Sequence, residues 1–278
     1  MNTQSNTIVI KVGGGEGIDP TALTPEIVEL HEAGMRVVLV HGGSHETNEL
    51  ADVLGHPTQI ITSPSGHQSR RTDRETLDIF KMVYCGKVNK TVVEHIRAAG
   101  LNAIGLSGID AGLWIGKRKS AIRSVVDGQT MIIRDDLSGR VESVNADFLN
   151  SLLDAGLVPV LTPPAVTADG IAINVDADRA AAATARALNA DELLLLSNVS
   201  GLLEDPSDPE SLIQDVNSGT MERAHTAAKG RMKNKVLAAQ EALEGGVSQV
   251  TIGSAGGDHP VEHARSGSGT RFSMELVT

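Results

Sequence analysis

A repeating pattern of polar and apolar positions runs along most of the chain. Five times, a segment rich in alanine and glutamate closes on glycine or asparagine, and an apolar run of strand length follows. The five segments are ELHEAGMRVVLV (29–40), HIRAAGLNAIGL (95–106), SLLDAGLVPVLT (151–162), ARALNADELLLL (185–196) and EALEGGVSQVTI (241–252). Glycine or asparagine near a helix C-terminus accepts the left-handed conformation that ends the helix. Near-continuous apolar strands that alternate with helices predict an α/β fold, a three-layer αβα sandwich with a mainly parallel central sheet.

Two segments depart from this pattern. Residues 122–144 (IRSVVDGQTMIIRDDLSGRVESV) carry short β-like runs separated by the turn signals DG and SG, and they predict a hairpin excursion. Residues 202–212 (LLEDPSDPESL) are acidic and interrupted by proline, which predicts a surface loop. At the first helix, Asp19 is expected to cap the start and Pro20 to occupy the first turn.

The length of the chain limits its domain organisation. Its 278 residues suit one large domain or two closely joined ones, with ample length for a hydrophobic core. No low-complexity linker separates the two halves. We therefore expect two lobes that share one continuous sheet, residues 1–173 and residues 174–278, with the boundary near Asn174.

Two glycine-rich loops follow apolar runs. Residues 8–17 read IVIKVGGGEG, and residues 37–50 read VVLVHGGSHETNEL. Ligands of α/β sheets bind beyond the carboxyl ends of the strands, where glycines let backbone N–H groups approach an anion without a Cβ in the way. On adjacent parallel strands the two loops would face each other across one cleft. Tight turns alone are the alternative for either loop, and neither has the spacing of a dinucleotide-binding motif or a P-loop.

Charged side chains in unusual places are compatible with an anion site. Lys11 interrupts an apolar strand, and a lysine buried there needs an anionic partner unless its stem reaches solvent. Asn174, Asp176 and Asp178 precede an alanine-rich helix, where capping explains one carboxylate and at least one is expected to turn inward. The basic residues of KGRMKNKVLAA (229–239) start another helix, which is unfavourable unless an anion binds there or the turn is solvated.

Arginines complete the candidate site. Arg70 and Arg71 precede a further helix, and an arginine fork suits a carboxylate, although one of the two is expected to be a surface residue. The nine histidines show no metal-binding spacing and no G-x-S-x-G elbow is present, which disfavours a zinc site and a serine hydrolase. Two lysines, glycine loops and an inward aspartate suit phosphoryl transfer, in which positioning and charge neutralisation supply most of the catalysis.

Composition narrows the functional class. A formal charge of −11 and 2% aromatic residues disfavour nucleic-acid binding. No apolar stretch approaches the ~18–20 residues of a membrane span, and the N-terminus lacks the features of a signal peptide. The single cysteine, Cys85, fits a reducing compartment, so we expect a cytoplasmic protein. Against this acidic background the basic run GKRKSAIR (116–123) stands out.

These motifs, in this order, resemble the amino acid kinase family and, within it, the N-acetylglutamate kinase branch. The resemblance extends from Ile8 to about Thr270 and rests on KVGGG (11–15), HGGSHETN (41–48), GKVNK (86–90), GLSGID (105–110), NVDAD (174–178) and GRMKNK (230–235). Ser44 stands where the family has a third glycine. Since a serine keeps the backbone N–H, we expect the loop to be retained.

Several stretches are more similar to the carrier-dependent kinases of this branch, the [LysW]-aminoadipate and [LysW]-glutamate kinases of lysine and arginine biosynthesis. They are TSPSGHQSRRTDRET (62–76), GKRKSAIRSVV (116–126), IIRDDLSGRVESVN (132–145) and GRMKNKVLAAQEALEGGV (230–247). The resemblance implies that ATP phosphorylates the side-chain carboxylate of an amino acid whose α-amino group is linked to the C-terminus of the carrier LysW. The product would be an acyl phosphate.

Two other functions stay open at this point. A kinase of free N-acetylglutamate would share the same catalytic residues. A non-catalytic nucleotide-binding regulator is disfavoured because mere ATP binding would not need both Lys11 and Lys235. Aminoadipate and glutamate differ by one methylene group, and the sequence does not choose between them.

The resemblance implies a role for each position of the site. Lys11 and Lys235 would stabilise the transferring phosphoryl group, and Asp178 would hold the two lysines in place. The substrate-binding residues would be Gly42, Gly43, Ser44, Arg70 and Asn174. The nucleotide-binding residues would be Gly13, Gly14, Ser197, Asn198 and Gly201, with asparagine at position 198 where the family usually has aspartate. Mg²⁺ would be held mainly by the nucleotide phosphates, and no metal ligand is expected from the chain.

The resemblance also implies protein partners. LysW of this family is a small acidic protein, and a local basic patch would attract it to an otherwise acidic kinase. We expect this docking patch at Lys117, Arg118, Lys119 and Arg123, and a solvated hairpin is the alternative. Members of the family are usually homodimers, and we expect a homodimer here.

Overall fold

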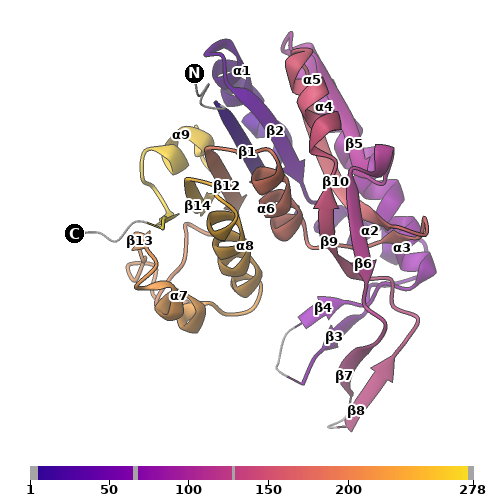
Figure 1. Ribbon diagram of the computed structural model, residues 1–278. Coiled ribbons are helices and arrows are strands. Elements are labelled where there is room, and N and C mark those ends of the chain that lie inside the picture. Colours follow the sequence, from indigo (N-terminus) through magenta and orange to yellow (C-terminus); the bar gives the residue numbers. More distant parts are fainter. Residues whose placement is uncertain (1–5, 65–67, 127–128, 275–278) are drawn as a thin grey trace.

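The computed structural model describes residues 6–64, 68–126 and 129–274, and a mostly parallel β-sheet forms its centre (Figure 1). In spatial order the strands are β13 (Asp215–Val216), β15 (Thr270–Phe272), β14 (Gln249–Ser254), β12 (Glu192–Ser197), β1 (Thr7–Val12), β2 (Arg36–His41), β10 (Val158–Thr167), β6 (Trp114–Arg118) and β9 (Gly139–Val144). Two more strands, β5 (Ala103–Gly108) and β11 (Ala172–Ile173), pair with β10. The pairs β14–β15, β6–β9 and β10–β11 are antiparallel, and the other pairs within the described part of this sheet are parallel.

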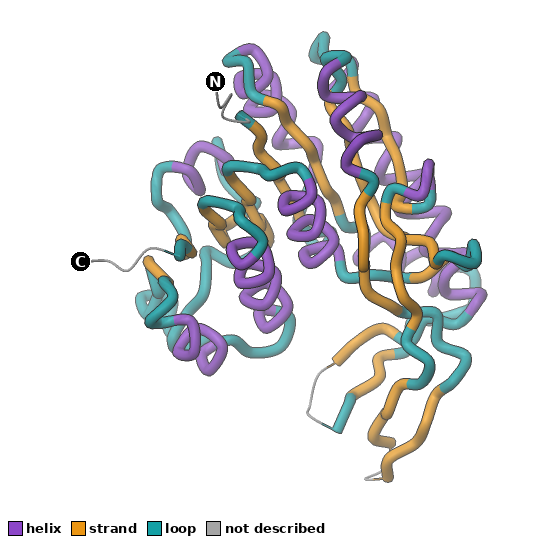
Figure 2. The backbone as a smooth tube through the Cα atoms, in the orientation of Figure 1, coloured by secondary structure: helices purple, strands orange, loops and turns teal. Residues whose placement is uncertain are grey.

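Helices cover both faces of the sheet (Figures 1 and 2). One face packs against α5 (Ala146–Asp154), α6 (Ala177–Ala187), α7 (Met221–Ala227) and α8 (Met232–Glu244). The other packs against α1 (Thr24–Glu32), α3 (Arg74–Lys81), the π-helical segment η2 (Met82–Val88), α4 (Asn89–Ala98) and α9 (Pro260–Arg265), with α2 (Ser44–Val53) beside them. Because strand side chains alternate, Val9 of β1 belongs to the first apolar cluster while Ile8 and Ile10 belong to the second. The predicted three-layer αβα sandwich is confirmed.

Two hairpins extend from one end of the sheet. They are β3 (Ile60–Thr62) with β4 (Gln68–Arg70), and β7 (Ile122–Val126) with β8 (Gln129–Ile133) (Figure 1). The predicted excursion is therefore present, but its third run, β9, returns to the central sheet as an antiparallel partner of β6. The predicted DG turn at residues 127–128 lies outside the described residues.

The sheet runs without a break between the two predicted lobes. Strand β1 from the first half pairs with β12 from the second over five register positions, from Ile8↔Glu192 to Val12↔Leu196. The division of the chain at residue 174 stays a prediction.

The fold modifies the expected cap at Asp19 and confirms the expected acidic surface loop. Asp19 accepts a hydrogen bond from Thr21 N at 2.8 Å, but it caps a short 3₁₀ turn, η1 (Pro20–Leu23), and α1 begins only afterwards at Thr24. Residues 204–210 are exposed, as expected for an acidic loop. Among the described residues, no helix is long and apolar enough to cross a bilayer.

Candidate active site at the carboxyl edge of the sheet

A buried carboxylate joins two lysines from distant parts of the chain. Lys11 lies near the carboxyl end of β1, on the strand face that carries Val9, and therefore points toward α6 and α8. Asp178 lies in the first turn of α6 and Lys235 in the first turn of α8. Lys11 Nζ is 2.6 Å from Asp178 Oδ1, and Lys235 Nζ is 2.9 Å from Asp178 Oδ2. Of the two aspartates predicted near this helix start, Asp178 is the one that turns inward.

Two lysines share one carboxylate in this cluster. Burial alone would raise the pKa of Asp178, but Lys11 and Lys235 hold it well below its usual range. Burial lowers the pKa of each lysine, and the charge of Asp178 raises it. The net result is a raised pKa for Lys11 and a lowered pKa for Lys235, on which the charge of Lys11 also acts to lower the pKa. Two ammonium groups thus share one firmly ionised carboxylate, and Asp176 acts on both lysines in the same direction as Asp178. Ammonium groups held in this way suit an anion such as a phosphate.

Asp176 performs the capping role that the sequence analysis assigned to one of these aspartates. Its side chain accepts a hydrogen bond from Arg179 N at 3.0 Å at the start of α6, and Asn234 Nδ2 donates to it at 2.7 Å. Burial and the nearby charge of Asp178 raise the pKa of Asp176.

The two predicted glycine loops touch each other. A Cβ placed on Gly14 would lie 2.0 Å from Gly43 N, and one on Gly42 would lie 2.8 Å from Gly14 N. Only glycine at both positions allows the two backbones to approach this closely. Ser44 Oγ and His45 N both donate to Gly14 O, at 2.7 and 2.8 Å. The loop is therefore retained with serine at position 44, and α2 begins at that residue.

The predicted acceptor residues lie beside these loops. Arg70 Nη2 donates to Ser44 O at 3.1 Å and to Asn48 Oδ1 at 2.7 Å, while its buried Nη1 has no hydrogen-bond partner within the described residues. Burial lowers the pKa of Arg70. The charge of Arg231 also lowers this pKa, whereas Tyr84 raises it. A buried guanidinium nitrogen without a partner suits a ligand carboxylate.

Asn174 and Arg71 have different surroundings. Asn174 Nδ2 donates to Thr72 Oγ1 at 3.1 Å, which holds its side chain beside the chain segment that follows Arg70. Arg71 forms an ion pair with Asp135, Nη2 to Oδ2 2.8 Å, and the aspartate side chain is 65% exposed. Of the two arginines, Arg71 is the one that pairs with an exposed carboxylate, although its buried Nε also has no hydrogen-bond partner within the described residues.

The predicted nucleotide residues divide into two groups. Gly13 N donates to Leu196 O at 2.9 Å, which places the first glycine loop against the end of β12. There, the buried Oγ of Ser197 has no partner within the described residues, and Asn198 is exposed. Gly201 is instead buried, where a Cβ would lie 2.7 Å from Thr270 Oγ1. Ser197 and Asn198 thus lie at the edge that carries the lysines, whereas Gly201 packs inside the fold.

The four predicted docking residues lie apart from the lysine cluster, at the base of the β7–β8 hairpin. Lys117, Lys119 and Arg123 are exposed. Arg118 is half-buried, and its guanidinium donates to Asp136 O at 2.7 Å and to Arg134 O at 2.6 Å. Arg118 therefore holds the hairpin base, while the other three side chains extend into solvent.

Several side chains around the site were not predicted from the sequence. Tyr84 lies on the π-helical segment, stacked on Phe80 with ring centroids 3.7 Å apart, and a Cβ on Gly43 would lie 3.2 Å from its ring. Asp136, 1% exposed, accepts hydrogen bonds from Thr72 N and Ser138 N at 2.8 and 2.7 Å. A π-helix interrupting an α-helix often marks a functional site, but nothing in the sequence pattern signals one.

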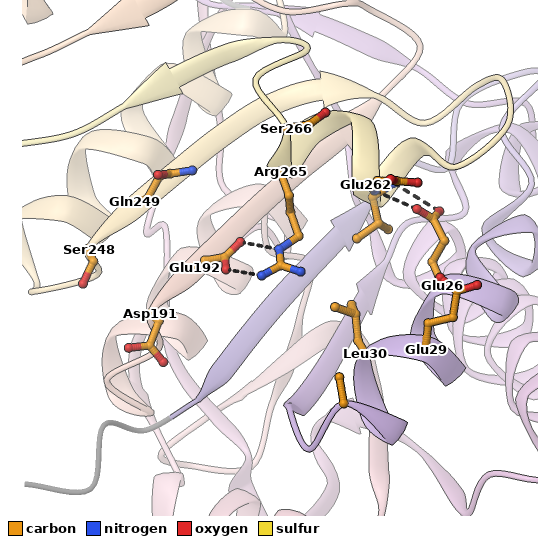
Figure 3. A pocket seen from close by; sticks show the side chains of 12 residues that line it. Glu26, Glu29, Leu30, Asp191, Glu192, Ser248, Gln249, Glu262, Arg265 and Ser266 are labelled. Atoms are coloured by element: carbon orange, nitrogen blue, oxygen red, sulfur yellow. Dashed lines mark hydrogen bonds and ion pairs between the residues drawn. The ribbon is translucent and has the colours of Figure 1, made fainter.

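A separate cleft lies at the opposite edge of the sheet. It has a volume of about 800 Å³ and is lined by the amino ends of β12 and β14 together with α1 and α9 (Figure 3). Arg265 pairs with Glu192 there, and Glu26 accepts hydrogen bonds from the first N–H groups of α9. Its remaining charged lining is acidic, so it does not suit an anion, and it contains none of the predicted site residues.

The chain is similar to known proteins in sequence and in fold. Residues 6–254 match the sequence model of the amino acid kinase family. The chain is 52% identical to the [LysW]-aminoadipate kinase of Deinococcus radiodurans, over 95% of this chain and 91% of that relative. It is 47% identical to the [LysW]-aminoadipate kinase of Thermus thermophilus, over 95% of this chain and 98% of that relative. Its fold is similar to N-acetylglutamate synthase from Neisseria gonorrhoeae, with a TM-score of 0.77 and 23% identity over 97% of this chain, which spans 60% of that longer protein.

Proposed function

The chain belongs to the amino acid kinase family, and from this premise we propose that it transfers the γ-phosphoryl group of ATP to a side-chain carboxylate. The acceptor would be aminoadipate, or glutamate as well, attached through its α-amino group to the carrier protein LysW. The names of the similar kinases support this substrate, and the observation that carries the proposal is the buried Lys11–Asp178–Lys235 cluster beside two touching glycine loops.

The chemistry needs no general base. A side-chain carboxylate, with a pKa near 4.3 in water, is already ionised at neutral pH and can attack directly. One of its oxygens forms the new bond to the γ-phosphorus as the bond from that phosphorus to the ADP oxygen breaks, which yields an acyl phosphate and ADP. The protein must position the two reactants and offset the charge on the equatorial oxygens, a role that Lys11 and Lys235 suit.

The residues of the site fit the phosphate chain of ATP. Glycine at positions 14 and 42 keeps Cβ atoms out of the contact between the two loops, and the buried Ser197 Oγ beside them is an unused hydrogen-bonding group. No group of three or more potential metal ligands occurs among the described residues. We propose that Mg²⁺ enters with ATP and is held mainly by its phosphates, where it would offset their charge.

A test of the acceptor site uses Arg70. Replacing Arg70 with alanine should raise KM for the carrier-linked acceptor about 10- to 100-fold, the loss of one charge-assisted hydrogen-bond pair, and leave KM for ATP nearly unchanged. Steady-state kinetics with each substrate varied in turn measure both constants. Arg71→Ala is the matched control, because Arg71 pairs with exposed Asp135, and it should change neither constant more than about twofold. A selective loss of ATP binding in Arg70→Ala would place this residue in the nucleotide site.

The exposed basic residues Lys117, Lys119 and Arg123 are proposed to dock LysW, with Arg118 holding the hairpin from which they project. Reversing these three charges to glutamate should lower kcat/KM for the carrier-linked substrate at least about tenfold at low salt, because complementary charge acts mainly on association rate. The wild-type advantage should shrink as salt rises.

Activity on free N-acetylglutamate serves as the control for this triple variant. It should be unaltered, since the catalytic lysines are untouched. Equal losses on both acceptors would show that the three residues are structural, and no loss on either would place the docking surface elsewhere.

A coupled ADP-release assay with LysW-linked aminoadipate, LysW-linked glutamate and N-acetylglutamate tests the proposed function. Turnover with a carrier-linked substrate at a kcat/KM well above that for N-acetylglutamate is the expected result. The reverse order would identify a free N-acetylglutamate kinase, and no turnover with any acceptor would leave a nucleotide-binding regulator.

We also propose a homodimer, which light scattering of the purified chain tests: a mass of one chain would contradict it.

A further inference from the structure

A fully buried histidine touches the second glycine loop. His41 ends β2 with 0% of its surface exposed, and its Nδ1 lies 2.8 Å from Gly42 O. Its Nε2 lies 3.1 Å from Nδ2 of Asn89, the first residue of α4, which is 1% exposed. No step of the proposed phosphoryl transfer uses either side chain, so their complete burial next to the loop needs another explanation.

The neighbours of Asn89 determine which nitrogen of His41 carries the proton. Asn89 Nδ2 also donates to Val160 O at 2.9 Å, and its Oδ1 accepts from Lys90 Nζ at 3.1 Å. A carbonyl oxygen can only accept and an ammonium can only donate, so these two partners fix the orientation of the amide. The amide nitrogen therefore faces His41, whose Nε2 must accept. The single proton of the neutral ring is then on Nδ1, and it is donated to Gly42 O.

The ring is held neutral by its surroundings. Burial lowers the pKa of His41 to about 4. The hydrogen bond to the Gly42 carbonyl raises this pKa, and the charge of Lys90 lowers it further. A proton on Nε2 would also face the Asn89 amide hydrogens. Neutral imidazole with its proton on Nδ1 is thus the form that satisfies every hydrogen bond on the ring.

This hydrogen bond determines the direction of the next N–H group. The peptide unit is planar and trans, so the Gly42 carbonyl and the Gly43 N–H point in opposite directions. With the carbonyl turned to buried His41, the Gly43 N–H points away from it. The Gly43 nitrogen is also the atom that borders the first glycine loop, since a Cβ on Gly14 would lie 2.0 Å from it.

We propose that His41, kept in its Nδ1–H form by Asn89, is the positioning residue that turns the Gly42–Gly43 peptide so that its N–H is presented to the reacting oxygens. This inference rests on the proposed kinase function for its catalytic consequence, while the geometry it describes is a property of the resting protein. His41 acts only through Gly43, because Asn89 and the loop itself occupy both of its ring nitrogens.

The first test needs no substrate. Nitrogen-15 NMR of the full chain labelled at histidine distinguishes the three forms of imidazole, and the His41 signal is assigned as the one lost in His41→Asn. We expect neutral imidazole with its proton on Nδ1 at both pH 7 and pH 5.5. A proton on Nε2 or a charged ring at either pH would overturn the proposal. This result stands whatever the enzyme phosphorylates.

The second test separates positioning from packing. His41→Leu fills the site with an apolar side chain that cannot donate a hydrogen bond to Gly42 O. Its kcat should fall about 10- to 100-fold, the loss expected when a reacting contact shifts by about 1 Å. His41→Asn places an amide nitrogen near the position of Nδ1, and its kcat should exceed that of His41→Leu at least about tenfold. KM for ATP should stay within about twofold in both.

Thr184→Val is the matched control for the loss of a buried hydrogen bond. Thr184 is 0% exposed and accepts from Trp114 Nε1 at 3.0 Å, away from the glycine loops. Its kcat should remain within about twofold of wild type despite a comparable loss of stability. Equal kcat values for His41→Leu and His41→Asn, or a His41→Leu value like that of Thr184→Val, would overturn the positioning role. If wild type transfers phosphate to no acceptor, the proposed function fails and the NMR result still decides the geometry.

Discussion

Replacing either Lys11 or Lys235 with alanine is expected to lower kcat by about 10²–10⁴-fold, the cost of removing one preorganised electrostatic group from a reaction centre. Both ammonium groups are more than nine-tenths buried and both contact Asp178, so they are held in place before the substrates arrive. Their charge is needed most when the phosphoryl group is between donor and acceptor. KM for either substrate should change much less than kcat, and single-turnover measurements of phosphoryl transfer separate the two effects.

Lys233 provides a matched control for Lys235. It lies in the same first turn of α8, two residues earlier, and its side chain is exposed. Lys233→Ala changes the net charge by the same amount and should leave kcat within about twofold, since an exposed charge is screened by solvent. A kcat near the wild-type value in Lys11→Ala or Lys235→Ala would remove that lysine from the reaction centre.

The second large effect concerns the carboxylate between the lysines. Asp178→Asn removes the charge that compensates two buried ammonium groups, and leaving a buried charge without its partner typically costs about 3–5 kcal/mol. We expect a loss of this size in the free energy of unfolding at pH 7, measured by urea denaturation, together with a lower kcat because the lysines are no longer held. Asp135→Asn is the control, since Asp135 is 65% exposed and pairs with Arg71 at the surface; its cost should be below about 1 kcal/mol.

The difference in unfolding free energy between wild type and Asp178→Asn should depend on pH, because it follows the pKa of Asp178. Because that pKa is held below its value of about 3.9 in the unfolded chain, the unfolded state takes up a proton first as the pH falls. The stability that Asp178 contributes is therefore fully present at neutral pH and decreases as the pH drops below about 4. The gap between wild type and Asp178→Asn should narrow over the same interval. A gap that is small at pH 7, or that widens in acid, would contradict the assignment of the lysine–aspartate cluster.

The elements of the fold follow from short stretches of sequence. The alternation of strand side chains, the glycines that end helices and the aspartates that start them are interactions over a few residues. They predicted the parallel sheet, its two helical layers and a capping aspartate at the start of α6. The close approach of Gly14 and Gly43 was also foreseeable, because parallel strands bring their carboxyl ends to one edge. The lysine that interrupts β1 required an anion, and the family resemblance implied Asp178 as its partner.

Apart from the role that the family resemblance implied for Asp178, the tertiary structure decided which partners meet. Asp178 rather than Asp176 reaches Lys11 because the two lie at different angles on the first turn of α6, and that difference matters only once the helix is packed on β1. Arg118 belongs to a basic run like its neighbours, yet its strand position turns it toward two backbone carbonyls.

By itself the sequence determined the local elements, the glycine loops and the kinds of side chain available for phosphoryl transfer. It did not determine the proton position on His41, which depends on Asn89, 48 residues away, and through it on Val160. Hydrogen-bond direction in a buried network is set by all of its members together, so it exists only when strands and helices from distant parts of the chain have come into contact.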